Sequence, residues 1–191
     1  MTRWTRALGA TLLCLPMLAQ ALQLAGVEVP RQVSVQGIEQ PLLLNGAGVR
    51  KKFFVKVYVA GLYLPQPQRD AAQLLAAPPP NRVLMHFVHS EVSREKMDAA
   101  WLDGFEANLG QAQFSALRPR LQQFMDLFGT LYQGDRVWLD HLPGQGTRVS
   151  INGELRGVVP GSDFNAALLA VWLGAEPVTD SLKKGLLGAD R

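Results

Sequence analysis

The chain has 191 residues, 48% of them hydrophobic, and a formal net charge of +3 from 19 Lys and Arg against 16 Asp and Glu. Removal of the N-terminal signal peptide that the sequence predicts lowers this charge to +1, and such a near-neutral balance argues against a nucleic-acid partner, which needs clustered basic charge. A single cysteine excludes an internal disulfide, so the core must be stable alone, which about 170 residues in one domain allow.

The first 21 residues have the layout of a secretory signal peptide. Arg3 and Arg6 supply the positive start, residues 7–18 the apolar middle, and Ala19-Gln20-Ala21 a small-residue cleavage site. We expect the mature chain to begin at Leu22 and to be a periplasmic protein without a stable membrane span. The alternative is a membrane anchor, which needs about 20 apolar residues and no cleavage site.

Cleavage after Ala21 changes the composition of the chain. It removes two arginines and Cys14, which lowers the formal net charge to +1 and leaves no thiol. A lipoprotein site is excluded, because Cys14 is not preceded by the small residues that such a site requires.

The first half of the mature chain has the pattern of β-strands. Short alternating segments over residues 22–35, broken at Pro30, predict an opening strand pair that leads to residues 42–44. The strongest strand, residues 53–64, is rich in aromatic and β-branched residues, and Gly61 within it indicates a bulge or a close backbone approach. Alternation divides the strand into one face with Phe53, Val55, Val57 and Val59 and another with Phe54, Lys56, Tyr58 and Ala60.

Helices and a hairpin follow. Helices are predicted over residues 70–77 and 115–128. Between them, Ser93 is the predicted N-cap of a helix whose apolar face carries Met97, Trp101, Phe105 and Leu109. Two further helices end the chain, one capped by Ser162 or Asp163 and running to Leu173, the other capped by Thr179 or Asp180 and covering 181–187. Strands are predicted over 82–89, 136–142, 147–151 and 154–159, with Asn152-Gly153 as a two-residue hairpin turn. This order indicates one α+β domain over residues 22–191, an antiparallel β-sheet with a layer of helices on one face.

The familiar cofactor motifs are absent from the sequence. It has no phosphate-binding glycine loop, nucleophile elbow or zinc helix. His86 and His89 are three residues apart, so on a strand they face opposite sides and do not share a metal. The aromatic residues Trp101, Phe105 and Trp172 are predicted to be core rather than a ligand pocket. We therefore expect no metal and no cofactor.

Arg50 is the strongest candidate for a functional side chain. Gly46 and Gly48 precede it and predict a turn that aims the arginine across the sheet, while Lys51 and Lys52 face solvent. The guanidinium has a fixed fork of donors that suits a carboxylate or a phenolate. The alternative is an arginine in a surface salt bridge. By spacing, Tyr58 and Lys56 share one strand face.

The segment Gly46-Ala47-Gly48-Val49-Arg50, followed by residues 54–64, resembles the opening strands of the chalcone isomerase family, specifically its exported bacterial branch. A weaker likeness covers the strand before Ser93, residues 94–97, the passage 157–164 and the end of the chain, 177–187. The resemblance implies the open-faced sandwich of that family, an antiparallel sheet with helices on one face and a cleft between them.

The resemblance also implies one of two activities. Plant members cyclise a chalcone to a flavanone, and other members bind fatty acids without catalysis. The arginine that holds the developing enolate in the plant enzymes falls on Arg50, and a threonine that orders a water falls on Tyr58. The plant tyrosine falls on Ser93, an asparagine falls on Ala100, and Thr179 is a candidate for a further hydroxyl.

Three hypotheses follow. In the first, the cleft binds an apolar carboxylate such as a fatty acid or an aromatic acid, with ligand contacts from Arg50, Tyr58, Ser93 and Thr179. In the second, the protein is an isomerase, an intramolecular lyase acting on a chalcone-like or other unsaturated carbonyl compound, with Arg50 and Tyr58 catalytic. In the third, it binds a protein partner in the cell envelope and Arg50 is structural.

Overall fold

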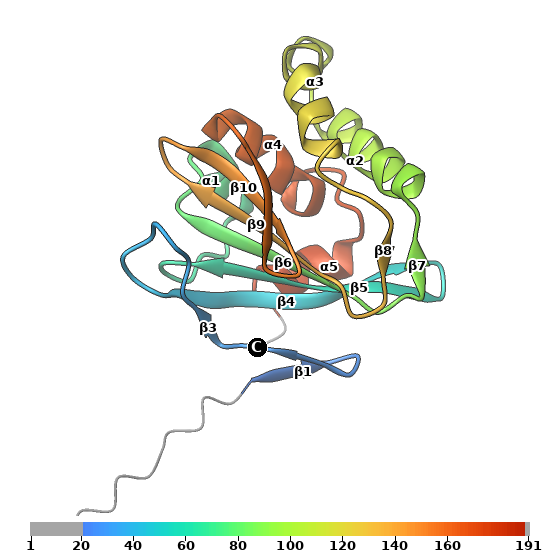
Figure 1. Cartoon of the computed structure of the whole chain (residues 1–191). Coiled ribbons are helices and arrows are strands. Elements are labelled where there is room, and N and C mark those ends of the chain that lie inside the picture. The colour runs from blue at the N-terminus through green and yellow to red at the C-terminus, as the bar shows by residue number, and fades with distance from the viewer. Residues whose placement is uncertain (1–20, 190–191) are drawn as a thin grey trace, which may run out of the picture.

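A seven-stranded antiparallel sheet organises the computed structural model, which describes residues 21–189 (Figure 1). Nearly all of the predicted signal peptide lies outside these residues. In spatial order the strands are β11 (Glu154–Val159), β10 (Gly146–Ile151), β9 (Arg136–Leu142), β6 (Asn81–Phe87), β5 (Val55–Leu64), β4 (Leu42–Lys52) and β3 (Gln32–Val33). Two small two-stranded sheets pair β1 (Leu22–Leu24) with β2 (Val27–Val29) in a hairpin, and β7 (Glu91–Val92) with the distant β8 (Leu131–Tyr132).

The helices lie on one face of this sheet, which confirms the predicted fold class (Figure 1). They are α1 (Ala71–Ala76), α2 (Arg94–Asn108), α3 (Gln111–Met125), α4 (Ser162–Leu173) and α5 (Asp180–Leu186). The main core fills the space between helices and sheet. A second apolar cluster lies on the opposite face, where the β1–β2 hairpin brings Val27 and Val29 against Leu42, Val59 and Tyr63. This face of the sheet is therefore also covered, a feature that the sequence pattern does not reveal.

The predicted N-cap is correct for α2 and wrong for α4. The Ser93 hydroxyl accepts a hydrogen bond from the backbone N–H of Lys96 (3.4 Å) and caps α2, as predicted. The N-cap of α4 is Gly161, with a φ of +97°, rather than Ser162 or Asp163. Asp163 lies instead in the first turn of α4, where its carboxylate pairs with Arg120 of α3 (2.6 Å).

The predicted glycine turn before Arg50 is wrong. Gly46 and Gly48 lie inside β4, which continues to Lys52, and the chain turns only at Phe53-Phe54. Both glycines leave room for α5, because a Cβ at Gly46 would meet the carbonyl groups of Gly185 and Leu186. The strand predicted over 42–44 thus extends to Lys52 as β4, and the strand predicted over 53–64 begins two residues later, at Val55, as β5. The glycines serve helix packing rather than a bend.

The β4–β5 pair contains two register shifts, at Asn45 and at Val57, and none at Gly61. Of the two alternatives predicted for Gly61, the bulge is therefore wrong; a Cβ there would lie 3.2 Å from the Tyr63 ring and 3.4 Å from the Val29 side chain, so the close neighbours are side chains rather than backbone. The Asn45 amide donates to the carbonyl of Leu186 (2.8 Å) and ties the end of α5 to the sheet. The shift at Val57 breaks the alternation between Lys56 and Tyr58, so these two side chains do not share a face as predicted.

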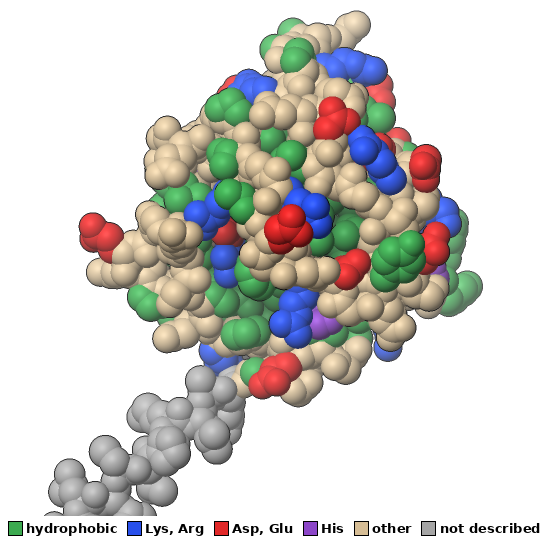
Figure 2. All heavy atoms as spheres, viewed as in Figure 1, with side chains coloured by type: hydrophobic (Ala, Val, Ile, Leu, Met, Phe, Trp, Pro, Cys, Tyr) green, Lys and Arg blue, Asp and Glu red, His purple; other side chains and the backbone are tan. Residues whose placement is uncertain are grey.

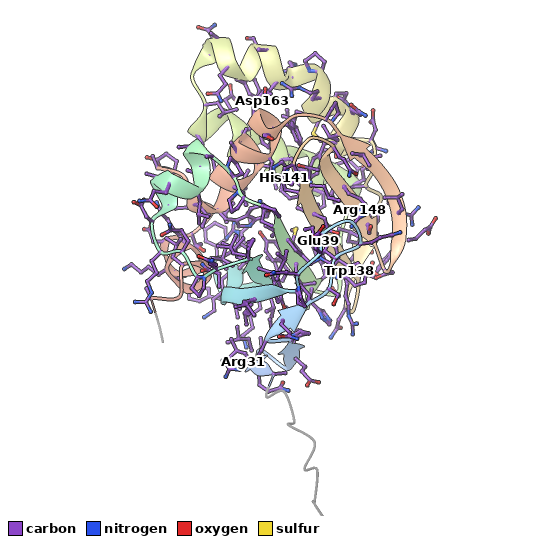
Figure 3. All side chains as sticks on the ribbon, turned by 90° about the vertical axis from the view of Figure 1, so that its left-hand side faces the viewer. Arg31, Glu39, Trp138, His141, Arg148 and Asp163 are labelled. Carbon is purple, nitrogen blue, oxygen red and sulfur yellow. The ribbon has the colours of Figure 1, made fainter. Side chains whose placement is uncertain are left out.

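The outer face of the sheet carries a buried ion network. Asp140 accepts from Arg82 at 2.6 Å and 2.9 Å and from Arg148 at 3.1 Å. The Arg82 guanidinium also lies over the Trp138 ring, 4.8 Å from its centroid. Figure 3 shows Trp138 and Arg148 on neighbouring strands of this side. Both arginines of the network thus share one carboxylate within the protein.

Candidate functional site

Arg50 and Tyr58 are directly opposite each other on β4 and β5. Residues paired in this way lie on the same face of an antiparallel sheet, with Cβ atoms about 5 Å apart. Tyr58 belongs to the core on the helix side, so both side chains face the helices. The structure therefore brings together the two residues to which the sequence assigned both catalytic and ligand-binding roles.

A cleft of about 710 Å³ lies beside this pair. Its walls are the end of the β4–β5 hairpin, β7, α2 and the loop after α4, and its size falls within the roughly 300–1,000 Å³ typical of small-molecule sites. The inner wall is apolar, whereas charged side chains stand at the exposed rim. The inner wall includes Val57, Met85, Met97, Trp101, Gly104 and Val171, and the rim includes Lys52, Glu91, Lys96, Asp103 and Glu176.

Tyr58 is almost completely buried at the base of this cleft, with 7% of its surface exposed. Its hydroxyl oxygen accepts a hydrogen bond from Nε1 of Trp172 (2.9 Å), which leaves the phenolic proton to donate. Burial raises the pKa of Tyr58 to about 12, while the Trp172 hydrogen bond and the charge of Arg50 act against this rise. Tyr58 is therefore a neutral hydrogen-bond donor over the physiological pH range.

Arg50 is half-buried at the edge of the cleft. Nη1 donates to the backbone carbonyl of Lys51. Among residues 21–189, no Asp or Glu forms an ion pair with it. The surface salt bridge considered as an alternative is thus absent from the described part of the chain. A guanidinium without a carboxylate partner, next to a neutral phenol, is suited to an anionic group of a ligand.

Ser93 and Thr179 do not join this pair. Neither lines the cleft. Ser93 is engaged as the N-cap of α2, and Thr179 precedes α5, with its buried Oγ1 lacking a hydrogen-bond partner among the described residues. The loop before Thr179 does reach the cleft, through Pro177 and Val178. Thr179 is therefore next to the cleft along the chain, but its side chain does not line the cleft.

The two histidines face different surroundings, but only His86 lies on a strand, because β6 ends at Phe87 and not at residue 89 as predicted. His89 lines the cleft, whereas His86 pairs with Val59, which faces the β1–β2 hairpin. Within residues 21–189, no three His, Cys, Asp or Glu side chains gather closely enough to hold a metal ion.

The comparison with known families decides the identity of the fold. A family model described as chalcone isomerase-like matches residues 21–188. The chain belongs to the chalcone isomerase-like family. A search of curated protein sequences finds no match.

A solved member of similar fold is a fatty-acid binding protein of Arabidopsis thaliana, AtFAP1. The two structures agree with a TM-score of 0.66, over 86% of this chain and 93% of the plant protein, at 17% sequence identity. At this identity the likeness establishes a shared chalcone isomerase-like fold. The site must be argued from the residues of this chain.

Sequence reasoning missed the helical wall of the cleft. Trp101 was predicted to be core, and it does pack against Phe124, Phe128 and Trp172, but it also lines the cleft. The available signal was the row of small residues on α2, Ala100, Gly104 and Ala107, which all line the cleft. The small side chains of Ala100 and Ala107 leave space at the cleft, whereas Gly104 admits the Val171 side chain, which a Cβ there would meet at 2.9 Å.

Proposed function

We propose that this chalcone isomerase-like protein binds a fatty acid or a similar apolar carboxylate in the cleft. Arg50 pairs with the carboxylate and the Tyr58 hydroxyl donates a hydrogen bond to it. The observation that carries the proposal is the direct pairing of Arg50 with Tyr58, beside an apolar cleft and without an internal counter-ion. The name of the structurally similar plant protein supports the same class of ligand.

The ligand's hydrocarbon part fits the inner wall. Met97 and Trp101 of α2 and Val171 of α4 present apolar surface at a distance from the charged rim. Burial of an apolar chain there contributes about 0.8 kcal/mol for each CH₂ group. Affinity is therefore expected to rise with chain length until the inner wall is filled, while the carboxylate remains at Arg50.

An isomerase acting on an unsaturated carbonyl compound is the second candidate. Arg50 would stabilise the developing enolate, and Tyr58 would donate a proton. A pKa of about 12 makes Tyr58 a weak acid at neutral pH, and Ser93 does not line the cleft. These observations favour binding over catalysis. Acceleration of chalcone cyclisation that is lost in Arg50→Ala would reverse this order.

Titration calorimetry with dodecanoate tests the binding proposal. We expect micromolar or tighter binding to the wild-type protein and a Kd about 10- to 100-fold higher in Arg50→Gln, because a charged hydrogen bond contributes about 1.5–3 kcal/mol. Arg136→Gln is the matched control, an exposed arginine on β9 away from the cleft. Equal affinity in all three proteins would remove Arg50 from the site.

We also propose that the protein acts in the periplasm after cleavage at Ala21. The charged start, the apolar stretch and the small-residue site in residues 1–21 support export. N-terminal sequencing of protein recovered from the periplasm should begin at Leu22. Recovery of the chain with Arg3 and Arg6 still present would contradict cleavage.

A further inference from the structure

The β4–β5 turn exposes two aromatic side chains. Phe53 and Phe54 form the turn and are 88% and 101% exposed, and the next residue, Val55, is 46% exposed. In Figure 2 hydrophobic side chains project from the right-hand edge of the molecule, the edge where Figure 1 places this turn. Exposed apolar groups gathered in one place mark an interaction site more often than scattered ones do.

The backbone at this turn makes the aromatic residues more unusual. Phe53 has a φ of +56°, a conformation in which a bulky side chain is disfavoured and a two-residue hairpin prefers glycine or asparagine. The β10–β11 turn of the same chain satisfies this preference with Asn152-Gly153. The β4–β5 turn thus retains aromatic side chains at a backbone position that disfavours them, and fold stability does not explain their presence.

The charged residues that flank the turn in the sequence are all basic. Lys51, Lys52 and Lys56 are exposed beside the two rings, and the sequence from residue 40 to residue 69 contains no Asp or Glu. None of these lysines forms an ion pair in the part of the chain that the structure describes. Aromatic rings flanked by lysines match the two layers of an anionic membrane surface, the acyl boundary and the headgroups.

The same turn forms part of the mouth of the cleft, because Lys52, Phe53 and Val55 line it. We propose that the β4–β5 turn docks on the surface of an anionic phospholipid bilayer, with the rings at the acyl boundary and the lysines among the headgroups. The described residues contain no helix long and apolar enough to cross a bilayer. Passage of an acyl ligand between bilayer and cleft additionally rests on the proposed function.

Flotation with vesicles of phosphatidylcholine and phosphatidylglycerol tests the docking, using the protein as purified from cells with the same N-terminus in every variant. We expect the wild-type protein to bind and Phe53→Gly with Phe54→Ser to bind about tenfold more weakly, without loss of folding, because glycine suits the turn. Replacing one of the three lysines by Gln should weaken binding about fivefold at low salt. Leu155→Ser, which removes a side chain 58% exposed on β11, is the control and should bind like wild type.

Three results would overturn the proposal. They are a wild-type protein that stays unbound, a turn variant that binds as well as wild type, and vesicle-free self-association that the turn variant abolishes, which would assign the rings to a second copy of the chain. The flotation contains no fatty acid and the calorimetry contains no vesicles. Failure of docking and failure of ligand binding are therefore observed separately.

Discussion

Two arginines of the same sheet differ in what neutralises them. Arg82 on β6 is 9% exposed and shares Asp140 with Arg148 on the outer face. Arg50 on β4 is half-buried on the helix face, and in the described structure it has no carboxylate partner. The first charge is used to hold strands together, whereas the second is available to a ligand.

This difference teaches how to separate a structural from a functional charge in this fold. The attraction within a buried ion pair is largely offset by the desolvation of its two charges, so the pair adds little net stability. Removal of one partner, however, leaves a buried charge without compensation and lowers the free energy of unfolding strongly. Removal of an arginine without an internal partner changes the free energy of unfolding little, and its effect is seen in the affinity for an anionic ligand. Substitutions in the Asp140 network should therefore lower stability, whereas substitution of Arg50 should weaken ligand binding and leave stability nearly unchanged.

The largest expected effect on stability is at Asp140, the carboxylate shared by Arg82 and Arg148. Asp140→Ala leaves Arg82 and Arg148 without their shared carboxylate and should lower the free energy of unfolding by about 3–5 kcal/mol in urea titrations. Asp163→Ala is the control, because its carboxylate is 59% exposed in the pair with Arg120, and should cost about 1 kcal/mol or less. Similar losses in both variants would remove the distinction between a buried and an exposed pair.

Tyr58→Phe should have an intermediate effect on stability. It removes the acceptor of the Trp172 indole N–H and leaves a buried donor without a partner. This should lower the free energy of unfolding by about 1–3 kcal/mol. Dodecanoate affinity should also fall, by about threefold to tenfold, because one neutral hydrogen bond to the carboxylate is lost. Urea unfolding and calorimetry measure the two quantities, and an unchanged stability would show that Trp172 finds another acceptor.

Alkaline pH offers a further test of the buried phenol. The folded-state pKa of Tyr58, about 12, lies above its ordinary value of 10.0, so folding favours the protonated form. This contribution is complete below about pH 10 and is lost as the pH rises towards 12. Tyr63, whose pKa burial also raises to about 12, adds to the same loss. The fall in unfolding free energy above pH 10 should be smaller in Tyr58→Phe.

The smallest expected effect on stability is at Arg50. Arg50→Gln breaks no ion pair of the described structure and should change the free energy of unfolding by less than about 0.5 kcal/mol. A fall of several degrees in Tm would assign Arg50 a structural role and would favour the hypothesis of a partner-binding envelope protein.

The sequence predicts elements whose signals are local. The Asn152-Gly153 turn and the Ser93 cap depend on a few adjacent residues, and both are confirmed. The predicted turn at Gly46 and Gly48 was wrong because the reason for glycine there is α5, which lies far along the chain. The Asp140 network and the helical wall of the cleft were missed for the same reason, since both join distant segments.

Arg50 itself was found from the sequence, although the supposed bend that presents it does not exist. Its cross-strand pairing with Tyr58 depends on the shift at Val57, which alternation cannot reveal. The predicted site therefore kept its two central residues. It lost Ser93 and Thr179, neither of which lines the cleft.

A cycle of two proteins and two ligands tests the central claim most directly. Wild type and Arg50→Gln are each titrated with dodecanoate and with its methyl ester, which retains the chain but carries no charge. The account predicts that the substitution weakens dodecanoate about 10- to 100-fold and leaves the ester's Kd unchanged. An equal loss for both ligands would show that Arg50 shapes the cleft and does not pair with a carboxylate.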